Sequence, residues 1–250
     1  MEGEARVWHR KVLYRHPSKR GTEGFGTLEF LVDIVGVIKV YKTYIKRLLD
    51  IIFALLMFIP LLLVVGICAF LIKMEDKGPA FYCGERLGKD GEVFKMYKLR
   101  TMKVNAPDLR NPDGSTYNSP EDSRLTRIGS VLRKTSLDEL PQIINILIGN
   151  MSFIGPRPDL PEHIHIYVGE DFRKLEVLPG ISGYNQANLR NGGQWKERLK
   201  NDVYYVNNIS FLLDLEILFK TIKVIVRRDN VYTEMPGNMG VKTNGRQRHI

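Results

Sequence analysis

An acidic pair lies among basic residues in the segment RKTSLDELPQIINILIGNMSFIGPRP. Asp138 and Glu139 are adjacent, Arg133 and Lys134 precede them, and Arg157 follows in a proline-flanked turn. Guanidinium groups bind phosphate oxygens in a bidentate way, and Mg²⁺ bridges carboxylates to phosphates. An aspartate can also act as a phosphoryl nucleophile. These residue types therefore allow an aspartate to attack a bound diphosphate whose charge is neutralised by arginines and Mg²⁺.

The same segment has a purely structural interpretation. Ser136 and Glu139 have the spacing of a capping box. Apolar residues then recur at helical spacing as far as Ile148, and Gly149 ends the pattern. Pro141 requires that this helix be bent or begin late. Because a helix turns 100° per residue, Asp138 and Glu139 point in different directions. The segment can therefore be interpreted either as a helix cap with surface salt bridges or as a phosphate site.

Composition narrows the class of protein. The chain has 250 residues, 44% of them hydrophobic, and a formal net charge of +9. It can form one sizeable domain, with or without an accessory segment. The charge predicts an anionic partner, either nucleic acid, an acidic membrane surface or a phosphorylated substrate. Nucleic acid is not expected, because no recognition motif is present. Cys68 and Cys83 suggest neither a disulfide framework nor a metal site, and His163 with His165 is too little for one.

Residues 51–72 carry no charged side chain and are long enough for a membrane helix of about 20 residues. Pro60 lies near the middle and predicts a bend. Basic residues flank both ends, beginning with Lys46 and Arg47 on one side and Lys73 on the other. Both ends would then prefer the cytoplasmic face, so a plain span and a re-entrant helix remain open.

Other elements follow from local patterns. Turn residues at 89–91 predict a β-hairpin. Helical spacing begins at 127–134 and recurs at 160–168 and 211–228. Residues 28–45 predict an interfacial helix or an ordinary core helix. We expect residues 1–27 to form a basic arm rather than a secretory signal.

Four strings in this sequence resemble the small monotopic phosphoglycosyl transferases, also called bacterial sugar transferases. In chain order they are KRLLDIIFALLMFIPLLL, GERLGKDGEVFKMYKLRTM, DSRLTRIGSVLRKTSLDELPQIINILIGNMSFIGPRP and LPGISGYNQ. The third string is long and specific. The resemblance covers residues 46–230.

The resemblance implies an enzyme that transfers a sugar-1-phosphate from a UDP-sugar to polyprenol (undecaprenyl) phosphate and releases UMP. It implies a ping-pong reaction that opens the assembly of a surface glycan or a glycoprotein glycan, with downstream glycosyltransferases as further partners. The location implied is the cytoplasmic face of the bacterial inner membrane, in contact with its lipids. Loops 103–121 and 181–195 are our candidates for sugar specificity.

Residue roles carry over position by position. The resemblance makes Asp138 the covalent nucleophile and a Mg²⁺ ligand, and Glu139 its catalytic partner and a second candidate ligand. The remaining matched positions divide into substrate-binding and membrane residues. The substrate-binding set is Lys98, Arg133, Pro156, Arg157, Pro158, Asp202 and Asp214, and the membrane set is Lys46, Arg47 and Pro60.

The implied fold is an α-rich α/β protein. It has a basic arm with an interfacial helix (1–45), a re-entrant helix bent at Pro60 (46–75), a cytosolic catalytic α/β domain with amphipathic helices on the membrane surface (76–230) and a basic mobile tail (231–250). The family bends its helix at a Ser-Pro pair, whereas this chain has Ile59-Pro60. A homodimer is expected only because homo-oligomers are common.

Two other classes of protein compete with the transferase. A non-catalytic, membrane-anchored scaffold would use its basic face to recruit partners, and its Asp138 would be dispensable. A bitopic enzyme would span the membrane once and place its domain on the outer side.

Overall fold

The computed structural model describes residue 36 and residues 38–109, 117, 119, 122–189 and 195–227. The chain divides into two compact units, Met1–Val37 and Ile38–Ile250, and every element below belongs to the second. Several predictions lie wholly or partly outside the described residues. They concern the arm, most of the interfacial helix, the centre of each specificity loop and the tail.

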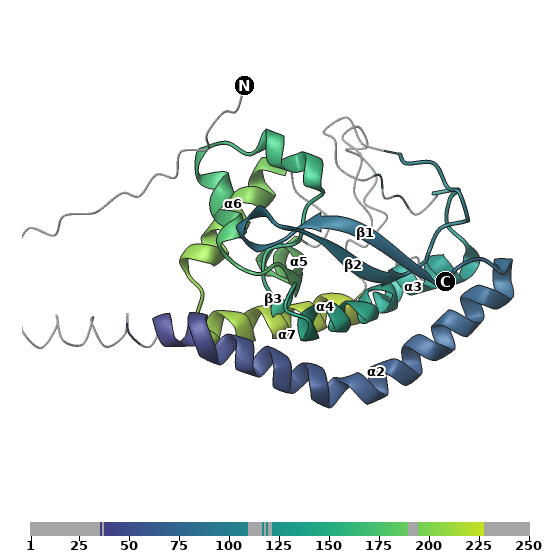
Figure 1. Cartoon of the computed structure of the whole chain (residues 1–250), viewed down its shortest axis with the longest axis horizontal. Coiled ribbons are helices and arrows are strands. Elements are labelled where there is room, and N and C mark those ends of the chain that lie inside the picture. Colours follow the sequence, from purple (N-terminus) through teal and green to yellow (C-terminus); the bar gives the residue numbers. More distant parts are fainter. Residues whose placement is uncertain are drawn as a thin grey trace, which may run out of the picture. The chain divides into compact units, whose positions relative to one another are not determined.

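A long apolar helix opens the second unit. Helix α2 (Lys46–Asp76) continues from a π-helical turn at Tyr41–Ile45 and contains Pro60. Figure 1 shows α2 as a bowed helix whose two ends both turn toward the rest of the unit. Proline explains a bend, because it removes one backbone hydrogen bond and clashes with the preceding turn. Among the described residues, the stretch Ile38–Asp76 is the one helix long and apolar enough to cross a membrane.

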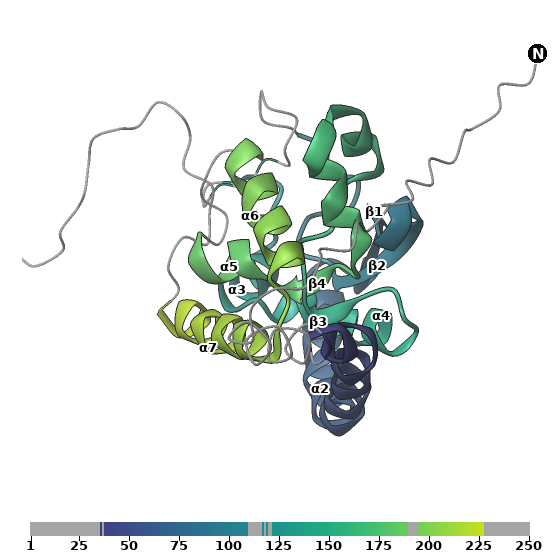
Figure 2. The ribbon, with the colours of Figure 1, turned by 90° about the vertical axis from the view of Figure 1, so that its left-hand side faces the viewer.

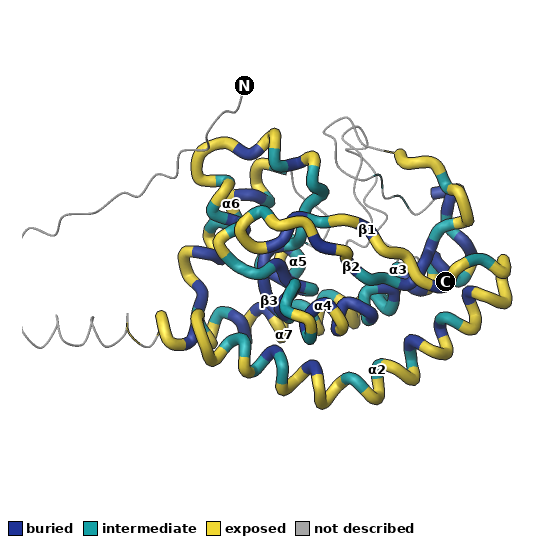
Figure 3. The backbone as a smooth tube through the Cα atoms, viewed as in Figure 1, coloured by how far each residue is buried: buried dark blue, intermediate teal, exposed yellow. Residues whose placement is uncertain are grey.

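One face of α2 packs against the unit along its length. Asp50, Ala54, Val65, Cys68 and Ile72 are buried at intervals that place them on one stripe. The opposite face carries large apolar side chains that are exposed, as the yellow stretches of α2 in Figure 3 show. The helix is therefore apolar on both faces but is covered on only one.

The predicted hairpin is confirmed. Strands β1 (Phe81–Leu87) and β2 (Val93–Leu99) pair antiparallel, and a short 3-10 turn at Lys89–Gly91 joins them. Asp90 and Gly91 both have positive φ angles, which aspartate and glycine tolerate better than most residues. The turn chemistry thus produced the hairpin at the expected place.

The segment around the acidic pair is not one continuous helix. Helix α3 (Arg127–Thr135) confirms the predicted start, and the late start that Pro141 predicted for the following helix is also confirmed. Residues Leu137–Gln142 form a 3-10 helix, η3, and only Ile143–Leu147 form an α-helix, α4. Pro141 lies inside η3 and cannot donate a helical hydrogen bond, which explains the interruption.

A second, parallel pair of strands lies at the centre of the unit. Strand β3 (Ser152–Ile154) pairs with β4 (Gly180–Ser182), and two 3-10 helices, η4 (Pro161–Ile166) and η5 (Gly169–Glu176), lie between them in sequence. The α-helix expected at 160–168 is therefore wrong in type. Strand β4 passes so close to Gly155 that a Cβ at Gly180 would collide with that residue's backbone.

Three helices complete the unit: α5 (Tyr184–Asn188), α6 (Trp195–Asn207) and α7 (Phe211–Arg227). Figures 1 and 2 place α7 on the same side as α2, with α6 on the opposite side. Large apolar side chains of α7, such as Leu212, Phe219 and Val226, are exposed. The helix predicted at 211–228 is confirmed, and it lies on the side of the bowed helix.

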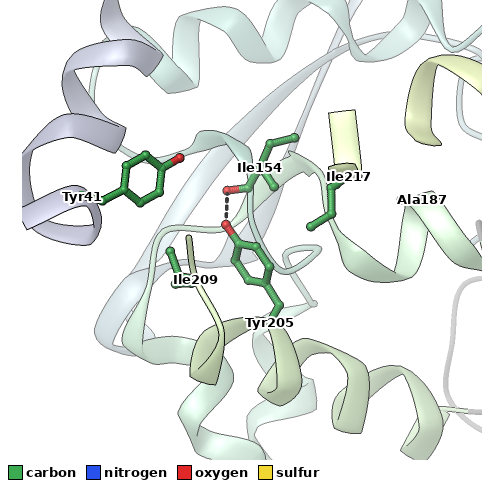
Figure 4. Close-up of a cluster of buried hydrophobic side chains, with 6 residues drawn as sticks. All are labelled: Tyr41, Ile154, Ala187, Tyr205, Ile209 and Ile217. Carbon is green, nitrogen blue, oxygen red and sulfur yellow. Dashed lines mark hydrogen bonds between the residues drawn. The ribbon is translucent and has the colours of Figure 1, made fainter. Parts of the chain in front are cut away.

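Figure 4 shows the buried cluster that joins these helices to β3. Tyr205 from α6 and Ile217 from α7 pack with Ile154 of β3, and Tyr41 reaches the same cluster from the turn before α2. The Tyr205 hydroxyl donates a hydrogen bond to the Ile154 carbonyl at 3.2 Å. The unit is helix-rich with two small sheets, as the α-rich prediction required.

Candidate active site

Strand β2 is fixed beside the acidic pair by a side chain from α4. Asn145, which is fully buried, accepts a hydrogen bond from the Tyr97 amide at 3.0 Å and donates one to the Lys95 carbonyl at 2.7 Å. The side chain thus replaces a neighbouring strand for two peptide groups of β2. As a result Lys98, one residue further on, lies against η3.

The capping-box interpretation of Ser136 and Glu139 is wrong. Ser136 adopts a left-handed conformation with a φ of 59° between α3 and η3, and its side chain makes no capping hydrogen bond. The Glu139 carboxylate instead accepts hydrogen bonds from Lys98 Nζ at 2.8 Å and Arg157 Nη2 at 3.3 Å. The left-handed residue separates the two helices, so the carboxylate is aimed at β2 and the proline-flanked turn.

The two carboxylates are held very differently. Glu139 forms ion pairs with both Lys98 and Arg157. Asp138 is buried, with 9% of its surface exposed, yet it makes no hydrogen bond or ion pair to another described residue. Glu139 therefore holds two cations, whereas the carboxylate oxygens of Asp138 are available to a ligand.

The pKa values of the two acids diverge for the same reason. Burial raises the pKa of Asp138 to about 6; Lys98 and the two arginines oppose the shift, and the negative charge of Glu139 adds to it. Burial alone would also raise the pKa of Glu139, but Lys98 and Arg157 outweigh it and lower that pKa to about 2. At neutral pH both groups are ionised, and Asp138 is the more basic of the two.

Two arginines flank the pair from different elements. Arg133 is in the last turn of α3, and its Nε donates to the Thr101 hydroxyl at 3.0 Å. Helix α3 approaches Thr101 so closely that a Cβ at Gly129 would collide with the Thr101 carbonyl. The Arg157 side chain is 43% exposed, so it can reach a ligand while it contacts Glu139. Lys134 is exposed on the same turn as Arg133.

The turn that carries Arg157 is rigid. Pro156 accepts a hydrogen bond from the Gly180 amide at 2.9 Å, and Pro158 restricts the backbone on the other side. Asp159 follows, and its carboxylate accepts hydrogen bonds from the Tyr167 hydroxyl at 2.6 Å and from Lys174 at 2.5 Å. Both sides of Arg157 are thus anchored.

Asp202 and Asp214, the other two predicted substrate-binding acids, lie in separate clusters. Asp202 is almost completely buried and forms an ion pair with Lys174 at 2.8 Å. Asp214 accepts hydrogen bonds from Lys46 at 2.6 Å, and from Tyr41 and Tyr205 at 2.7 Å each. The structure therefore joins Lys98, Glu139 and Arg157 directly, pairs Asp214 with Lys46, and pairs Asp202 with Lys174, which Asp159 shares.

The two ends of α2 are both attached to this unit. At its start, Lys46 pairs with Asp214, and Arg47 donates to the carbonyls of Leu147 and Met151 at 3.4 and 3.3 Å. At its end, Glu75 accepts hydrogen bonds from the first amides of α3, and Asp76 pairs with Arg100. Lys46 and Arg47, which the sequence analysis placed in the membrane set, thus also bind other residues of the unit. Sequence reasoning missed Glu75 and Asp76, which lie outside the quoted strings, and gave no role to Arg100, which lies in the string GERLGKDGEVFKMYKLRTM.

The described residues contain no group of three or more histidine, cysteine or acidic side chains that could hold a metal ion by themselves. His163 packs edge-on against Trp195, with ring centroids 4.6 Å apart. A cation at the acidic pair would therefore take most of its ligands from phosphate oxygens or water, as Mg²⁺ does. The uncommitted Asp138 oxygens suit such a cation.

Comparison with known proteins identifies the class. The model of the family described as "Bacterial sugar transferase" matches residues 41–228. An exopolysaccharide production protein of Sinorhizobium fredii is 37% identical over 222 residues, which cover 83% of this chain and 96% of that protein. The chain belongs to the bacterial sugar transferase family and is a phosphoglycosyl transferase.

Two further relatives are named for their substrates. The undecaprenyl-phosphate galactose phosphotransferase of Salmonella typhimurium is 38% identical over 169 residues, 63% of this chain and 36% of that protein. The UDP-N-acetylgalactosamine-undecaprenyl-phosphate N-acetylgalactosaminephosphotransferase of Aeromonas hydrophila is 37% identical over 193 residues, 73% of this chain and 44% of that protein. The chain spans less than half the length of both.

Proposed function

We propose that this protein transfers a sugar-1-phosphate from a UDP-sugar to polyprenol phosphate and releases UMP. The observation that carries the proposal is the unequal pair of acids. Glu139 holds Lys98 and Arg157 in place, whereas Asp138 is buried, more basic and without a partner among the described residues. The names of the Salmonella and Aeromonas relatives support undecaprenyl phosphate as the acceptor, and the Aeromonas name supports a UDP-sugar as the donor.

In the first half-reaction, a carboxylate oxygen of Asp138 attacks the phosphorus that carries the sugar. A new bond forms between that oxygen and the phosphorus, and the bond from the phosphorus to the oxygen bridging the two phosphates breaks. UMP leaves with the electron pair of that bond. Arg133 and Arg157 neutralise the phosphate oxygens, and Lys98 keeps Glu139 ionised beside them.

In the second half-reaction, a phosphate oxygen of the polyprenol phosphate attacks the same phosphorus. The Asp138 carboxylate leaves, and the product is a polyprenyl diphosphate sugar. Because the donor's nucleotide has already departed, both substrates can use one set of cations in turn. The residues fit Mg²⁺ held by Asp138, with Glu139 beside it, and bound Mg²⁺ would supply charge neutralisation for the phosphate oxygens.

The test uses the full chain in nanodiscs with Mg²⁺, polyprenol phosphate and a panel of UDP-sugars, and it measures UMP release. We expect release with one or a few donors. Release with none, under conditions where a characterised member of the family is active, would contradict the proposal and favour a scaffold.

The rate of the first half-reaction should depend on the ionisation of Asp138. Burial raises its pKa and bound Mg²⁺ would lower it, and only the carboxylate is nucleophilic, so the rate should fall about tenfold per pH unit below the pKa that Asp138 has in the Mg²⁺ complex and be level above it. Glu139, with a pKa of about 2, stays ionised throughout and adds no inflection.

The measurement is the UMP burst in a single turnover without polyprenol phosphate, since the acceptor phosphate itself titrates near pH 6. A burst rate that shows no fall toward acid pH anywhere in the range where the protein stays folded would contradict the assignment of Asp138 as nucleophile.

We also propose that α2 enters and leaves the membrane on one face. A straight helix of its 31 residues would be about 46 Å long, more than the roughly 30 Å of a hydrocarbon core. Yet Lys46 at its start and Asp76 at its end are both bound to the same compact unit. A membrane cannot separate two ends that are attached to one domain, so the unit and both ends lie on one side.

Labelling of engineered cysteines tests this topology. Lys42 is exposed just before α2, and the native Cys83 is exposed after it. With Cys68 replaced by alanine, we expect Cys83 and, in a Lys42→Cys, Cys83→Ser variant, the new thiol to react with an impermeant maleimide from the same side of sealed inverted vesicles. Reaction from opposite sides would show a span.

The remaining assignments follow from this topology and stay proposals. A face rich in phosphate-binding residues suits the cytoplasmic side of the bacterial inner membrane, where UDP-sugars are made and anionic lipids attract a basic protein. The exposed apolar faces of α2 and α7 would lie in that membrane. Downstream glycosyltransferases would use the polyprenyl diphosphate sugar.

A further inference from the structure

A small cavity lies beside Arg157, the arginine that contacts the acidic pair. Its volume is about 30 Å³, which is room for two or three water-sized groups at about 10–15 Å³ each. Arg157 lines this cavity and also contacts Glu139 at 3.3 Å. The cavity is therefore one side chain away from the proposed site of chemistry. Its other lining residues are Asp159, Lys174, Asn185, Gln186, Trp195, Arg198, Leu199 and Asp202.

Four polar atoms of the lining residues have no partner. Both amide atoms of Gln186, the indole Nε1 of Trp195 and the Nε of Arg198 are buried and make no hydrogen bond within the part of the chain that the structure describes. A buried polar group without a partner costs about 1–3 kcal/mol, and such groups are rare in native proteins. Four of them around one cavity require polar partners there, which ordered water or a polar ligand can supply.

The geometry of these atoms is preset. The Trp195 ring is held between His163, at a centroid distance of 4.6 Å, and the Arg198 guanidinium, which lies 5.4 Å from the ring centroid. The indole N–H therefore cannot turn away from its present direction. Asn185 donates hydrogen bonds to the Arg198 carbonyl and to Asp202, which joins α5 to α6 behind the cavity.

The charges of the lining favour a neutral ligand. Asp159 and Asp202 both pair with Lys174, at 2.5 and 2.8 Å. Asp159, Lys174 and Asp202 together carry a net charge of −1, and Arg198 in the same lining carries +1. Away from Arg157 the wall is thus close to neutral, unlike the cationic surroundings of the acidic pair. A phosphate would find no net attraction here.

We propose that this cavity receives the polar edge of the uracil base of the donor. The four unpartnered atoms comprise donors on Gln186, Trp195 and Arg198 and one acceptor, the Gln186 carbonyl oxygen. The edge of uracil offers the complement, two carbonyl oxygens and one imide N–H. Cytosine places an amino group where uracil has a carbonyl, and the indole N–H cannot accept from it. The inference rests on the proposed function, since it places the nucleoside beside Arg157, which neutralises the diphosphate in the proposed mechanism.

The experiment measures the dissociation constant of UMP with the full chain in nanodiscs, by calorimetry, without donor or turnover. Gln186→Leu removes two hydrogen bonds and should raise that constant about tenfold. Trp195→Phe removes one N–H but keeps a ring against His163, and it should raise the constant about threefold. The control is Asn188→Ala on the exposed face of the same helix, which should change nothing.

Two further readouts separate recognition from a structural effect. The unfolding temperature of Gln186→Leu should stay level or rise, because an unpartnered buried amide is replaced by an apolar group of similar size. Wild-type protein should bind UMP more tightly than CMP, and Trp195→Phe should lose most of that preference, because it removes the indole N–H that rejects the cytosine amino group. Inorganic phosphate should bind all variants equally.

Three results would overturn the inference. An unchanged dissociation constant for UMP in Gln186→Leu would make the cavity a structural water site. Equal binding of UMP and CMP by the wild type would exclude uracil recognition. A changed preference among UDP-sugars with unchanged UMP binding would assign the cavity to the sugar. Because these measurements need no turnover, absence of UMP release from every donor would overturn only the proposed function.

Discussion

Asp138→Asn should abolish the formation of the covalent intermediate, with UMP release falling at least about 1,000-fold. An amide oxygen is a poor nucleophile, and a covalent mechanism has no substitute for the group that becomes bonded to phosphorus. Glu139 cannot take over, because Lys98 and Arg157 hold it and keep its pKa at about 2. The measurement is UMP release with the active donor, with a gel assay for the phosphosugar-linked protein.

The same variant should not lose stability. A carboxyl whose pKa is raised from 3.8 to about 6 by burial binds its proton more tightly in the folded state. Its contribution to stability is present below pH 3.8 and is lost as the pH rises through 6. At pH 7.5 a neutral asparagine removes that penalty, so the unfolding temperature should stay level or rise.

Asp90→Asn is the matched control, since Asp90 is an exposed aspartate in the hairpin turn, 3.9 Å from Lys89. It should keep full activity and unchanged stability. If Asp138→Asn retained more than about a tenth of the wild-type rate, Asp138 would not be the nucleophile. If it lost activity together with a large drop in unfolding temperature, the loss could be attributed to unfolding, and the sign of the pKa argument would be wrong.

Asp214→Ala should destabilise the protein by about 3–5 kcal/mol. Asp214 is buried and accepts hydrogen bonds from Lys46, Tyr41 and Tyr205. Removing the carboxylate leaves the largely buried Lys46 ammonium without a counter-charge, which costs more than the pair itself contributes. Burial, with the nearby Asp214 charge, raises the pKa of Tyr205, so its hydroxyl stays a donor at neutral pH.

The measurement is the unfolding temperature in nanodiscs, where a loss of this size corresponds to roughly 10 °C in a domain of this length. Glu216→Ala is the control on the same helix. Its exposed ion pair with Lys220, at 2.7 Å, should contribute at most about 0.5 kcal/mol. Equal effects of the two substitutions would show that Asp214 does not anchor the start of α2. Asp214→Asn should fall between them, since an amide oxygen still accepts from the tyrosines.

Much of the fold follows from local patterns in the sequence. The uncharged run predicted α2, the Lys89–Gly91 turn predicted the hairpin, and helical spacing predicted α3 and α7. These signals act over a few residues, because periodicity and turn chemistry depend on near neighbours along the chain. They failed at Ser136, whose left-handed conformation replaces the predicted cap, whereas Pro141 correctly predicted the late start of α4.

The site divides in the same way. The sequence by itself determined which residues could do chemistry, namely an adjacent acid pair with arginines on both sides. Only the tertiary structure decided that Glu139 pairs with Lys98, 41 residues earlier, while Asp138 forms no hydrogen bond to another described residue. It also decided that Asp214 pairs with Lys46, 168 residues away. The choice of an ion-pair partner depends on which side chains packing brings within about 4 Å, and neither spacing nor composition encodes that proximity.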